Sequence, residues 1–127
     1  MSELVCLELS VLLWLAHVLV RLFTARAEFG DAYLLGPRDE KKTPKGLLCG
    51  RAERALANYV ENLVPFVALD LALIATGQTG GMGATLWIIG RIAYLPLYLS
   101  GIPYVRTAAW ALSIMGLLMM LARLAGY

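Results

Sequence analysis

The sequence contains four apolar runs, each close to the length that crosses a lipid bilayer, and no other feature restricts the fold so strongly. They cover about Leu4 to Phe23, Ala55 to Thr76, Met82 to Ser100 and Val105 to Leu124. A helix needs about 20 apolar residues to span a hydrocarbon core about 30 Å thick. Because 60% of the 127 residues are hydrophobic and only 16% are charged, polar side chains are too few to cover a water-soluble globule. The sequence therefore predicts an all-α, integral membrane four-helix bundle.

Residues 1–127 are expected to form a single domain. The first apolar run carries Glu3 and Glu8 where a signal peptide has basic residues, so we expect a retained helix. A long hydrophilic loop is predicted over about 24–50, between the first and second helices. The loop between the second and third helices, GQTGGMG, is short and suits a tight antiparallel hairpin.

The basic residues predict which side of the membrane each loop occupies. Most of them lie in or beside the first loop: Arg26, Arg38, Lys41, Lys42, Lys45, Arg51 and Arg54. Arg106 adds to the same side, and the opposite side has little beyond Arg123. Because cytoplasmic loops carry an excess of Lys and Arg, we expect this side in the cytoplasm and both termini on the other. Basic residues that flank a membrane without a stacking surface give no support to nucleic-acid binding.

The cysteines and the histidine do not form a metal-ligand pattern. Cys6 and Cys49 are expected on opposite sides of the membrane, which argues against a disulfide, and their spacing is not that of a metal site. His17 lies in an apolar helix, where a packing role is expected. No metal is therefore predicted.

The second apolar run begins with a polar stripe, in the stretch RAERALANYVENLVPF over residues 51–66. Arg51, Arg54, Asn58 and Glu61 follow one another at spacings of three, four and three residues. At about 100° per residue these side chains fall within an arc of about 80° on one helical face. A charged side chain in hydrocarbon costs at least about 2.5–3.5 kcal/mol. Glu61 must therefore face protein, water or a ligand.

The third helix carries a complementary polar face. Arg91, Tyr94 and Tyr98 repeat the spacing of three and four residues and so share one side of the helix. The second and third helices run in opposite directions, which places Glu61 and Arg91 at similar depth. We predict an ion pair between Glu61 and Arg91. Asp70 is expected on the opposite side of the second helix from Glu61.

These polar groups could simply hold the helices together, as polar side chains in membranes often do. A single Glu–Arg pair would be explained in that way, but the two faces contain many more polar groups than one pair requires. Together with Arg106, beyond the break at Gly101 and Pro103, they predict a net-positive cleft that opens to the cytoplasm. Such a cleft suits a small anion that carries both carboxylates and amines.

The pattern R-x-x-R-A-x-x-N-x-x-E of residues 51–61, with Pro65 close behind, resembles the MAPEG proteins, the membrane-associated proteins in eicosanoid and glutathione metabolism. The resemblance covers nearly the whole chain. Four helices, a long first cytoplasmic loop, a short second loop and the R-x-x-Y-x-x-x-Y run of residues 91–98 match in order. The chain looks most like short bacterial members related to microsomal glutathione transferases.

The resemblance implies a homotrimer of four-helix protomers in the bacterial inner membrane, with the active site facing the cytoplasm. Such trimers bind glutathione as a co-substrate at subunit interfaces. Family members conjugate glutathione to lipophilic electrophiles, reduce lipid hydroperoxides or isomerise eicosanoid endoperoxides. The implied partners are membrane lipids, further copies of the chain and a lipophilic small molecule.

The resemblance also implies roles for the residues of the polar stripe. Arg26, in TARAEF at the end of the first helix, would hold one glutathione carboxylate. Arg51 and Arg54 would add charge near the other carboxylate and the peptide backbone. Asn58 and Glu61 would contact the peptide and its amine.

The remaining residues are expected nearer the thiol. Arg91 belongs to the binding set, and Tyr94 and Tyr98 would form hydrogen bonds in the pocket. Because the thiolate is the nucleophile, a guanidinium beside the sulfur raises its reactive fraction, and Arg106 is the candidate for this role. Tyr98 could share the task as an O–H donor. The alternative for Arg106 is a membrane anchor that extends to the headgroups.

Two functions from other classes stay open. A non-catalytic trimeric scaffold would have the same helices and no affinity for a ligand. A small four-helix transporter would use a titratable carboxylate in the membrane. An unpaired Glu61 favours transport, whereas a Glu61 neutralised by arginine favours a glutathione site.

Overall fold

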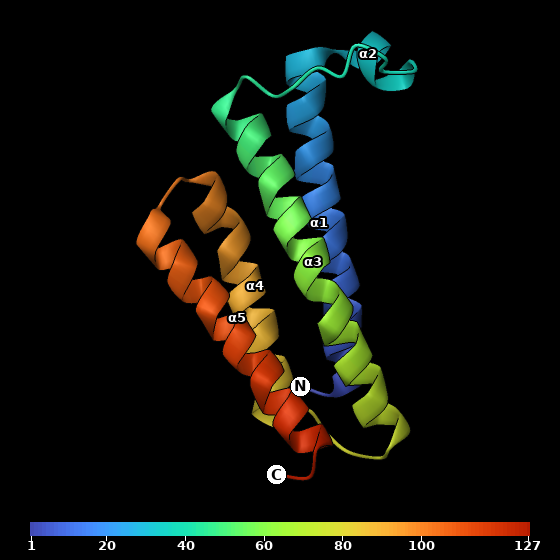
Figure 1. The fold of residues 1–127 in the computed structure, drawn as a ribbon, viewed down its shortest axis with the longest axis vertical. Coiled ribbons are helices and arrows are strands. Elements are labelled where there is room, and N and C mark those ends of the chain that lie inside the picture. The colour runs from blue at the N-terminus through green and yellow to red at the C-terminus, as the bar shows by residue number, and fades with distance from the viewer.

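The computed structural model of the protein describes residues 1–127 as five helices and no strands (Figure 1). The four long helices are α1 (Glu3–Phe29), α3 (Leu47–Ala75), α4 (Gly81–Leu99) and α5 (Pro103–Leu124), and the short helix α2 covers Asp31–Leu35. Each of the four long helices is long and apolar enough to cross a membrane. The prediction of an all-α four-helix membrane bundle is confirmed.

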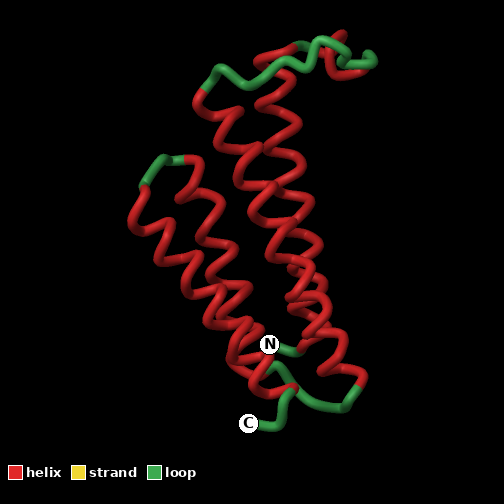
Figure 2. The backbone as a smooth tube through the Cα atoms, in the orientation of Figure 1, coloured by secondary structure: helices red, strands yellow, loops and turns green.

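The helices extend further into the first loop than the sequence predicted. The first helix continues to Phe29 instead of ending at Phe23, and α3 begins at Leu47 instead of Ala55. The predicted loop over 24–50 therefore shrinks to a short segment that also contains α2 (Figure 2). The prediction followed apolar side chains alone, whereas the polar ends of these helices continue to form backbone hydrogen bonds.

A side chain of α1 holds the beginning of α3. The carboxylate oxygen Oε1 of Glu28 accepts hydrogen bonds from the backbone N–H groups of Lys45 and Gly46. The first N–H groups of a helix and its cap have no carbonyl partner inside the helix. Glu28 supplies that partner from another helix, and so fixes where α3 leaves the loop.

The long helices form two antiparallel pairs, in which α1 packs mainly on α3 and α4 mainly on α5. The pairs lie close together at the end that carries both termini and diverge toward α2 (Figure 1). At the converging end, Oε1 of Glu3 accepts a hydrogen bond from the N–H of Gly80, and Arg123 donates to the carbonyl and the hydroxyl of Thr79. One end of the bundle is thus closed and the other open.

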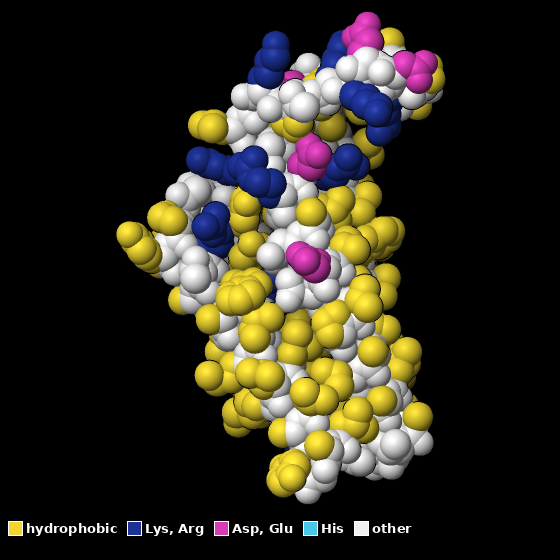
Figure 3. Space-filling view, viewed as in Figure 1, with side chains coloured by type: hydrophobic (Ala, Val, Ile, Leu, Met, Phe, Trp, Pro, Cys, Tyr) yellow, Lys and Arg dark blue, Asp and Glu magenta, His cyan; other side chains and the backbone are white.

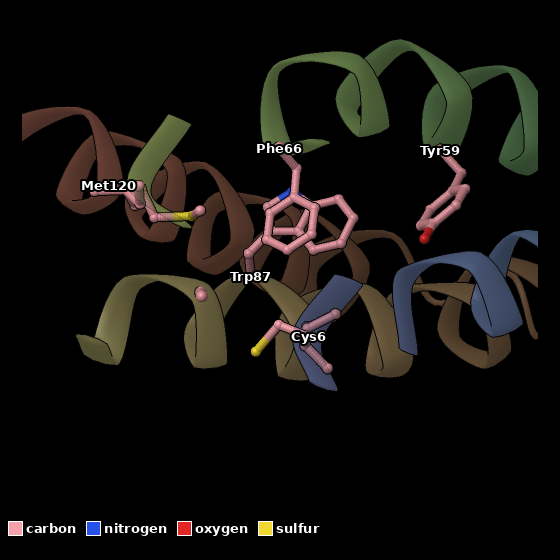
Figure 4. Packing of buried hydrophobic residues seen from close by; sticks show 8 residues of the cluster. Cys6, Tyr59, Phe66, Trp87 and Met120 are labelled. Atoms are coloured by element: carbon pink, nitrogen blue, oxygen red, sulfur yellow. The ribbon is translucent and has the colours of Figure 1, made fainter. Parts of the chain in front are cut away.

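Aromatic side chains form the core where the pairs meet (Figure 4). The rings of Phe66 and Trp87 are stacked with centroids 3.8 Å apart, and the ring centroid of Tyr59 lies 5.8 Å from that of Trp87. Cys6 of α1 and Met120 of α5 belong to the same buried cluster, so the other two long helices also contribute to it. All four long helices therefore share one core.

Polar residues are also buried in this region. His17 stacks on Tyr59 at 4.4 Å and its Nδ1 lies 2.8 Å from the carbonyl oxygen of Leu13, in keeping with the expected packing role. Asp70 is fully buried, on the opposite side of α3 from the exposed Glu61 as predicted. Cys6 and Cys49 are both free.

Small residues allow α4 and α5 to approach each other closely. A Cβ atom on Gly116 would lie 2.5 Å from the carbonyl oxygen of Gly83, and one on Gly90 would lie 2.8 Å from the carbonyl oxygen of Ala109. Helices in membranes associate through such small residues because backbone packing, rather than the hydrophobic effect, drives their contact.

We expect Gly116→Val to destabilise the protein by about 1–3 kcal/mol, because its side chain would meet backbone atoms that cannot move aside. The measurement is the thermal melting temperature of the detergent-purified protein. Ala111→Val on the exposed side of α5 is the matched control and should leave the melting temperature nearly unchanged. Equal melting temperatures for wild type and Gly116→Val would contradict the close packing of α4 on α5.

Candidate functional site

A cleft of about 270 Å³ lies between α3, α4 and α5, in the part of the bundle where the helix pairs diverge. Its lining residues come from three helices: Asn58 of α3, Tyr94 and Tyr98 of α4, and Arg106, Thr107 and Trp110 of α5. Four of these six were predicted from the sequence as site residues. Segments far apart in the chain thus bring the predicted amide, phenol and guanidinium groups to one place.

Tyr98 is the centre of the polar contacts in the cleft. The Nε of Arg54 donates a hydrogen bond of 3.1 Å to the Tyr98 hydroxyl oxygen. The guanidinium carbon of Arg106 lies 4.7 Å from the Tyr98 ring centroid, within range of a cation–π interaction. Tyr94 packs beside it, with ring centroids 5.5 Å apart. Two cations therefore flank one phenol, whose own O–H hydrogen stays free to donate to a ligand.

Arg91 lies behind the cleft rather than in its lining. It is fully buried, and its Nη1 donates a hydrogen bond of 2.8 Å to Oδ1 of Asn58. Its guanidinium carbon lies 4.4 Å from the Tyr94 ring centroid and 5.3 Å from that of Tyr59. Arg91 thus positions Asn58 and Tyr94, which do line the cleft.

The predicted ion pair between Glu61 and Arg91 is wrong for the protomer. Glu61 is exposed and forms no ion pair, and Arg91 binds Asn58 instead. The cause is the rotation of α3 about its axis, which turns Tyr59 toward the core. At about 100° per residue, Asn58 lies about 100° from Tyr59, at the edge of the buried face, whereas Glu61 lies about 160° from it. Glu61 therefore points away from α4.

The same rotation divides the arginines of the stripe. Arg51 is half-buried, and its Nη1 donates a hydrogen bond of 3.1 Å to the carbonyl oxygen of Leu99, the last residue of α4. A cation is favourable at that position because the last carbonyl groups of a helix carry partial negative charge. Arg54 is exposed and reaches Tyr98 through the length of its side chain. Arg51 supports the cleft and Arg54 borders it.

Arg26, like Glu61, is a predicted site residue that lies outside the cleft of its own protomer. Its Nε forms an ion pair of 2.8 Å with Asp31 at the beginning of α2, and both side chains are exposed. Arg26 belongs to the α1 and α3 pair, whereas the cleft lies between α3 and the α4 and α5 pair. The structure of one protomer does not bring Arg26 to the other predicted residues.

The charged side chains gather on one half of the molecule. In Figure 3 the Lys and Arg side chains cover the α2 end, and the opposite half of this face is mostly hydrophobic. Arg54 lies near the beginning of α3 and Arg106 near the beginning of α5, and this gathering of basic residues matches their expected asymmetry across the membrane. An anion that approaches from this side meets a positive field.

Two lining residues, Thr107 and Trp110, were missed by the sequence analysis. Trp110 follows Arg106 by four residues and so lies one turn further along the same face of α5. Spacing from Arg106 could have found Trp110, and Thr107 lies three residues before Trp110, on the same side of the helix. Trp110 is partly exposed and gives the deep side of the cleft an apolar wall.

We expect Asn58→Leu to destabilise the protein by about 3 kcal/mol, because it leaves the buried charge of Arg91 without its hydrogen-bond acceptor. Replacing both partners, in Asn58→Leu with Arg91→Met, should recover most of that loss, since no uncompensated charge remains. Thermal melting of the four proteins of this double-mutant cycle in detergent is the measurement. Additive losses in the double variant would show that the two residues act independently.

Comparison with known proteins is consistent with this architecture. The model of the MAPEG family matches residues 5–126, which is nearly the whole chain. No curated protein and no solved structure matches the chain. Four membrane-length helices and this match establish a multi-pass integral membrane protein. The chain belongs to the MAPEG family.

Proposed function

We propose that the protein is a glutathione-dependent membrane enzyme, which activates the glutathione thiolate for conjugation to lipophilic electrophiles or for reduction of lipid hydroperoxides. The observation that carries the proposal is the placement of Tyr98 between the guanidinium groups of Arg54 and Arg106 in a cleft. Membership of a family that includes glutathione transferases and peroxidases supports the same reading.

The polar groups around the cleft fit the charges of the tripeptide. Glutathione carries two carboxylates, one amine and one thiol. Arg54 offers a guanidinium for a carboxylate, in the geometry that favours paired hydrogen bonds. Asn58 offers an amide to the peptide backbone, and Glu61, which points away from the cleft of its own protomer, would offer its carboxylate to the amine at an interface between protomers. Each type of group on the ligand thus has a complementary group on the protein.

Arg106 and Tyr98 are proposed to act on the sulfur. A free thiol is mostly protonated at neutral pH, and a neighbouring cation favours the thiolate. Arg106 is half-buried in the cleft, where its charge is less screened than in water. The Tyr98 hydroxyl accepts from Arg54 and can donate to a thiolate in turn.

We propose that the site is completed in a homotrimer. The cleft of one protomer, about 270 Å³, lies below the range of about 300–1,000 Å³ typical of ligand pockets. Arg26 and Glu61 are exposed in the protomer, and a carboxylate at the depth of Glu61 is costly in lipid. A neighbouring protomer would cover Glu61 and bring its own Arg26 to the cleft.

The proposed location is the bacterial inner membrane, with the cleft open to the cytoplasm. The positively charged half of the molecule contains the cleft, and cytoplasmic segments carry an excess of Lys and Arg. Glutathione would enter from this side. The lipophilic second substrate would reach the cleft past Trp110 from the bilayer.

The unpaired Glu61 is the observation that favours the transporter alternative, by the criterion set out from the sequence. The family match over residues 5–126 weighs against transport. A scaffold would need no cleft in which cations converge on a phenol. Binding of glutathione distinguishes the enzyme from a scaffold, and formation of the bound thiolate distinguishes it from a transporter.

The test of the proposal is a titration of the detergent-purified protein with glutathione, followed by calorimetry and by the ultraviolet absorbance of the thiolate. We expect saturable binding with a rising thiolate signal. Binding without thiolate would remove the catalytic part of the proposal. No binding at millimolar concentrations of glutathione would overturn the proposal and would mean that the cleft serves a different anion.

We expect Arg106→Ala to lower kcat about 100-fold while glutathione binding is largely kept, because the thiolate loses its stabilising charge. Arg54→Ala and Glu61→Gln should instead weaken binding about tenfold, the loss of one hydrogen bond to a charged group. Turnover with a lipophilic electrophile and calorimetric affinity measure the two effects separately.

Arg123→Ala is the matched control, since it removes an arginine from the other end of α5, away from the cleft. It should change neither kcat nor affinity. If Arg106→Ala, Arg54→Ala and Glu61→Gln all reduced binding equally, the division into catalytic and binding residues would be refuted.

A further inference from the structure

A second cavity, of about 200 Å³, lies between α1, α2, α3 and the loop that follows α2, and shares no lining residue with the cleft. Three cations line it: Arg21 of α1, and Arg38 and Lys42 of the loop. Apolar side chains, among them Leu22 and Phe29, form much of the remaining wall. We call this cavity the basic groove.

The cations of the groove have donors to spare. The side chain of Arg21 forms no hydrogen bond and no ion pair with the protein. Arg38 donates from Nε and Nη2 to the carbonyl oxygen of Leu34, which leaves Nη1 free. Lys42 has one distant acidic neighbour, Glu40, at 3.9 Å. Because Glu53 is the one acidic residue in the lining, the groove keeps a net positive charge.

The loop around the groove has a specific fold. Tyr33 accepts a hydrogen bond of 2.8 Å from the backbone N–H of Lys42, and the Lys42 ammonium lies 4.9 Å from the same ring. Phe29 packs on Tyr33 with centroids 5.3 Å apart. Arg38 has a φ of 56°, a left-handed conformation that non-glycine residues rarely adopt. Such conformations persist where the surroundings hold them, and they concentrate at ligand sites.

The depth of the groove matches the boundary between hydrocarbon and headgroups. Arg21 lies about 27 Å along α1 from Glu3, at the helical rise of about 1.5 Å per residue, and the hydrocarbon core is about 30 Å thick. Leu19, Leu22 and Phe23 are exposed beside it on α1. A cation at this level thus borders an apolar helix surface on one side and the charged loop on the other.

We infer that the basic groove binds an anionic phospholipid, whose phosphate contacts Arg21, Arg38 and Lys42 and whose acyl chains lie along α1. The cations are opposite in charge to the phosphate, and the guanidinium groups match it in geometry. Basic pockets on the cytoplasmic side of membrane helices suit such headgroups. Glu53 offers an acceptor for a headgroup hydroxyl, which phosphatidylglycerol has.

A free soluble anion would not use the apolar wall, and a purely apolar partner would leave the net positive charge of the groove unbalanced. The charged loop on one side of the groove and the apolar surface of α1 on the other together fit an amphiphile that already resides in the bilayer. This site is independent of glutathione, so its test does not depend on the function of the cleft.

The experiment titrates phosphatidylglycerol or phosphatidylcholine into the full-length protein in neutral detergent, and counts bound lipids by native mass spectrometry. The melting temperature is followed in parallel. We expect phosphatidylglycerol to bind and stabilise more strongly than phosphatidylcholine. Arg21→Gln and Arg38→Gln should each weaken its binding about fivefold, the ratio that corresponds to about 1 kcal/mol per cation near an anionic surface.

Lys41→Gln is the matched control. Lys41 precedes Lys42, carries the same charge and does not line the groove, so its loss should leave the lipid affinity unchanged. Arg21 lies on a regular helix, where glutamine is tolerated even if the loop variant fails to fold.

Three results would overturn the inference. Equal affinities of Arg21→Gln and Lys41→Gln would show that the attraction is a general effect of net charge. Full competition by glycerol 1-phosphate would show that the acyl chains take no part. Dissociation of an oligomer by Arg21→Gln, with no lipid bound to the wild type, would show that another copy of the chain fills the groove.

Discussion

The stack of Phe66 on Trp87 joins the two helix pairs, and the open half of the molecule depends on it. Around these rings, side chains from all four long helices pack into one core at the end that carries the termini. Beyond the core the pairs are free to diverge, and the polar cleft lies there. A bundle packed equally along its whole length would have no room between α3 and α5. Fixing one end therefore creates space at the other.

The same core decides how each polar residue of α3 is used. The buried face of α3 carries Tyr59, Phe66 and Asp70. As a result, one edge of the polar stripe faces the interior of the protomer and the other edge faces its surroundings. Its inner edge, at Asn58, meets α4 and is held by Arg91. Its outer edge, at Glu61, faces away from the protomer. The protein thus combines a rigid internal polar contact with an exposed acidic group on one helix.

The sequence was sufficient for the features that depend on local spacing, and insufficient for those that depend on packing between distant segments. Membrane-length apolar runs predicted the four helices, and intervals of three and four residues placed Tyr94 and Tyr98 together. The rotation of α3 could not be derived, because it follows from contacts with α1 and α4. The early start of α3 escaped prediction for a similar reason, since its partner is Glu28 on another helix.

Trp110 gives the cleft an apolar wall on the side away from the charged loop. For a lipophilic molecule, such a wall makes the bilayer itself the reservoir from which the cleft is filled. Arrival then depends on lateral diffusion in two dimensions, and occupancy follows the mole fraction of the molecule among the lipids. Diluting the aqueous phase would change that occupancy little, whereas adding lipid would lower it.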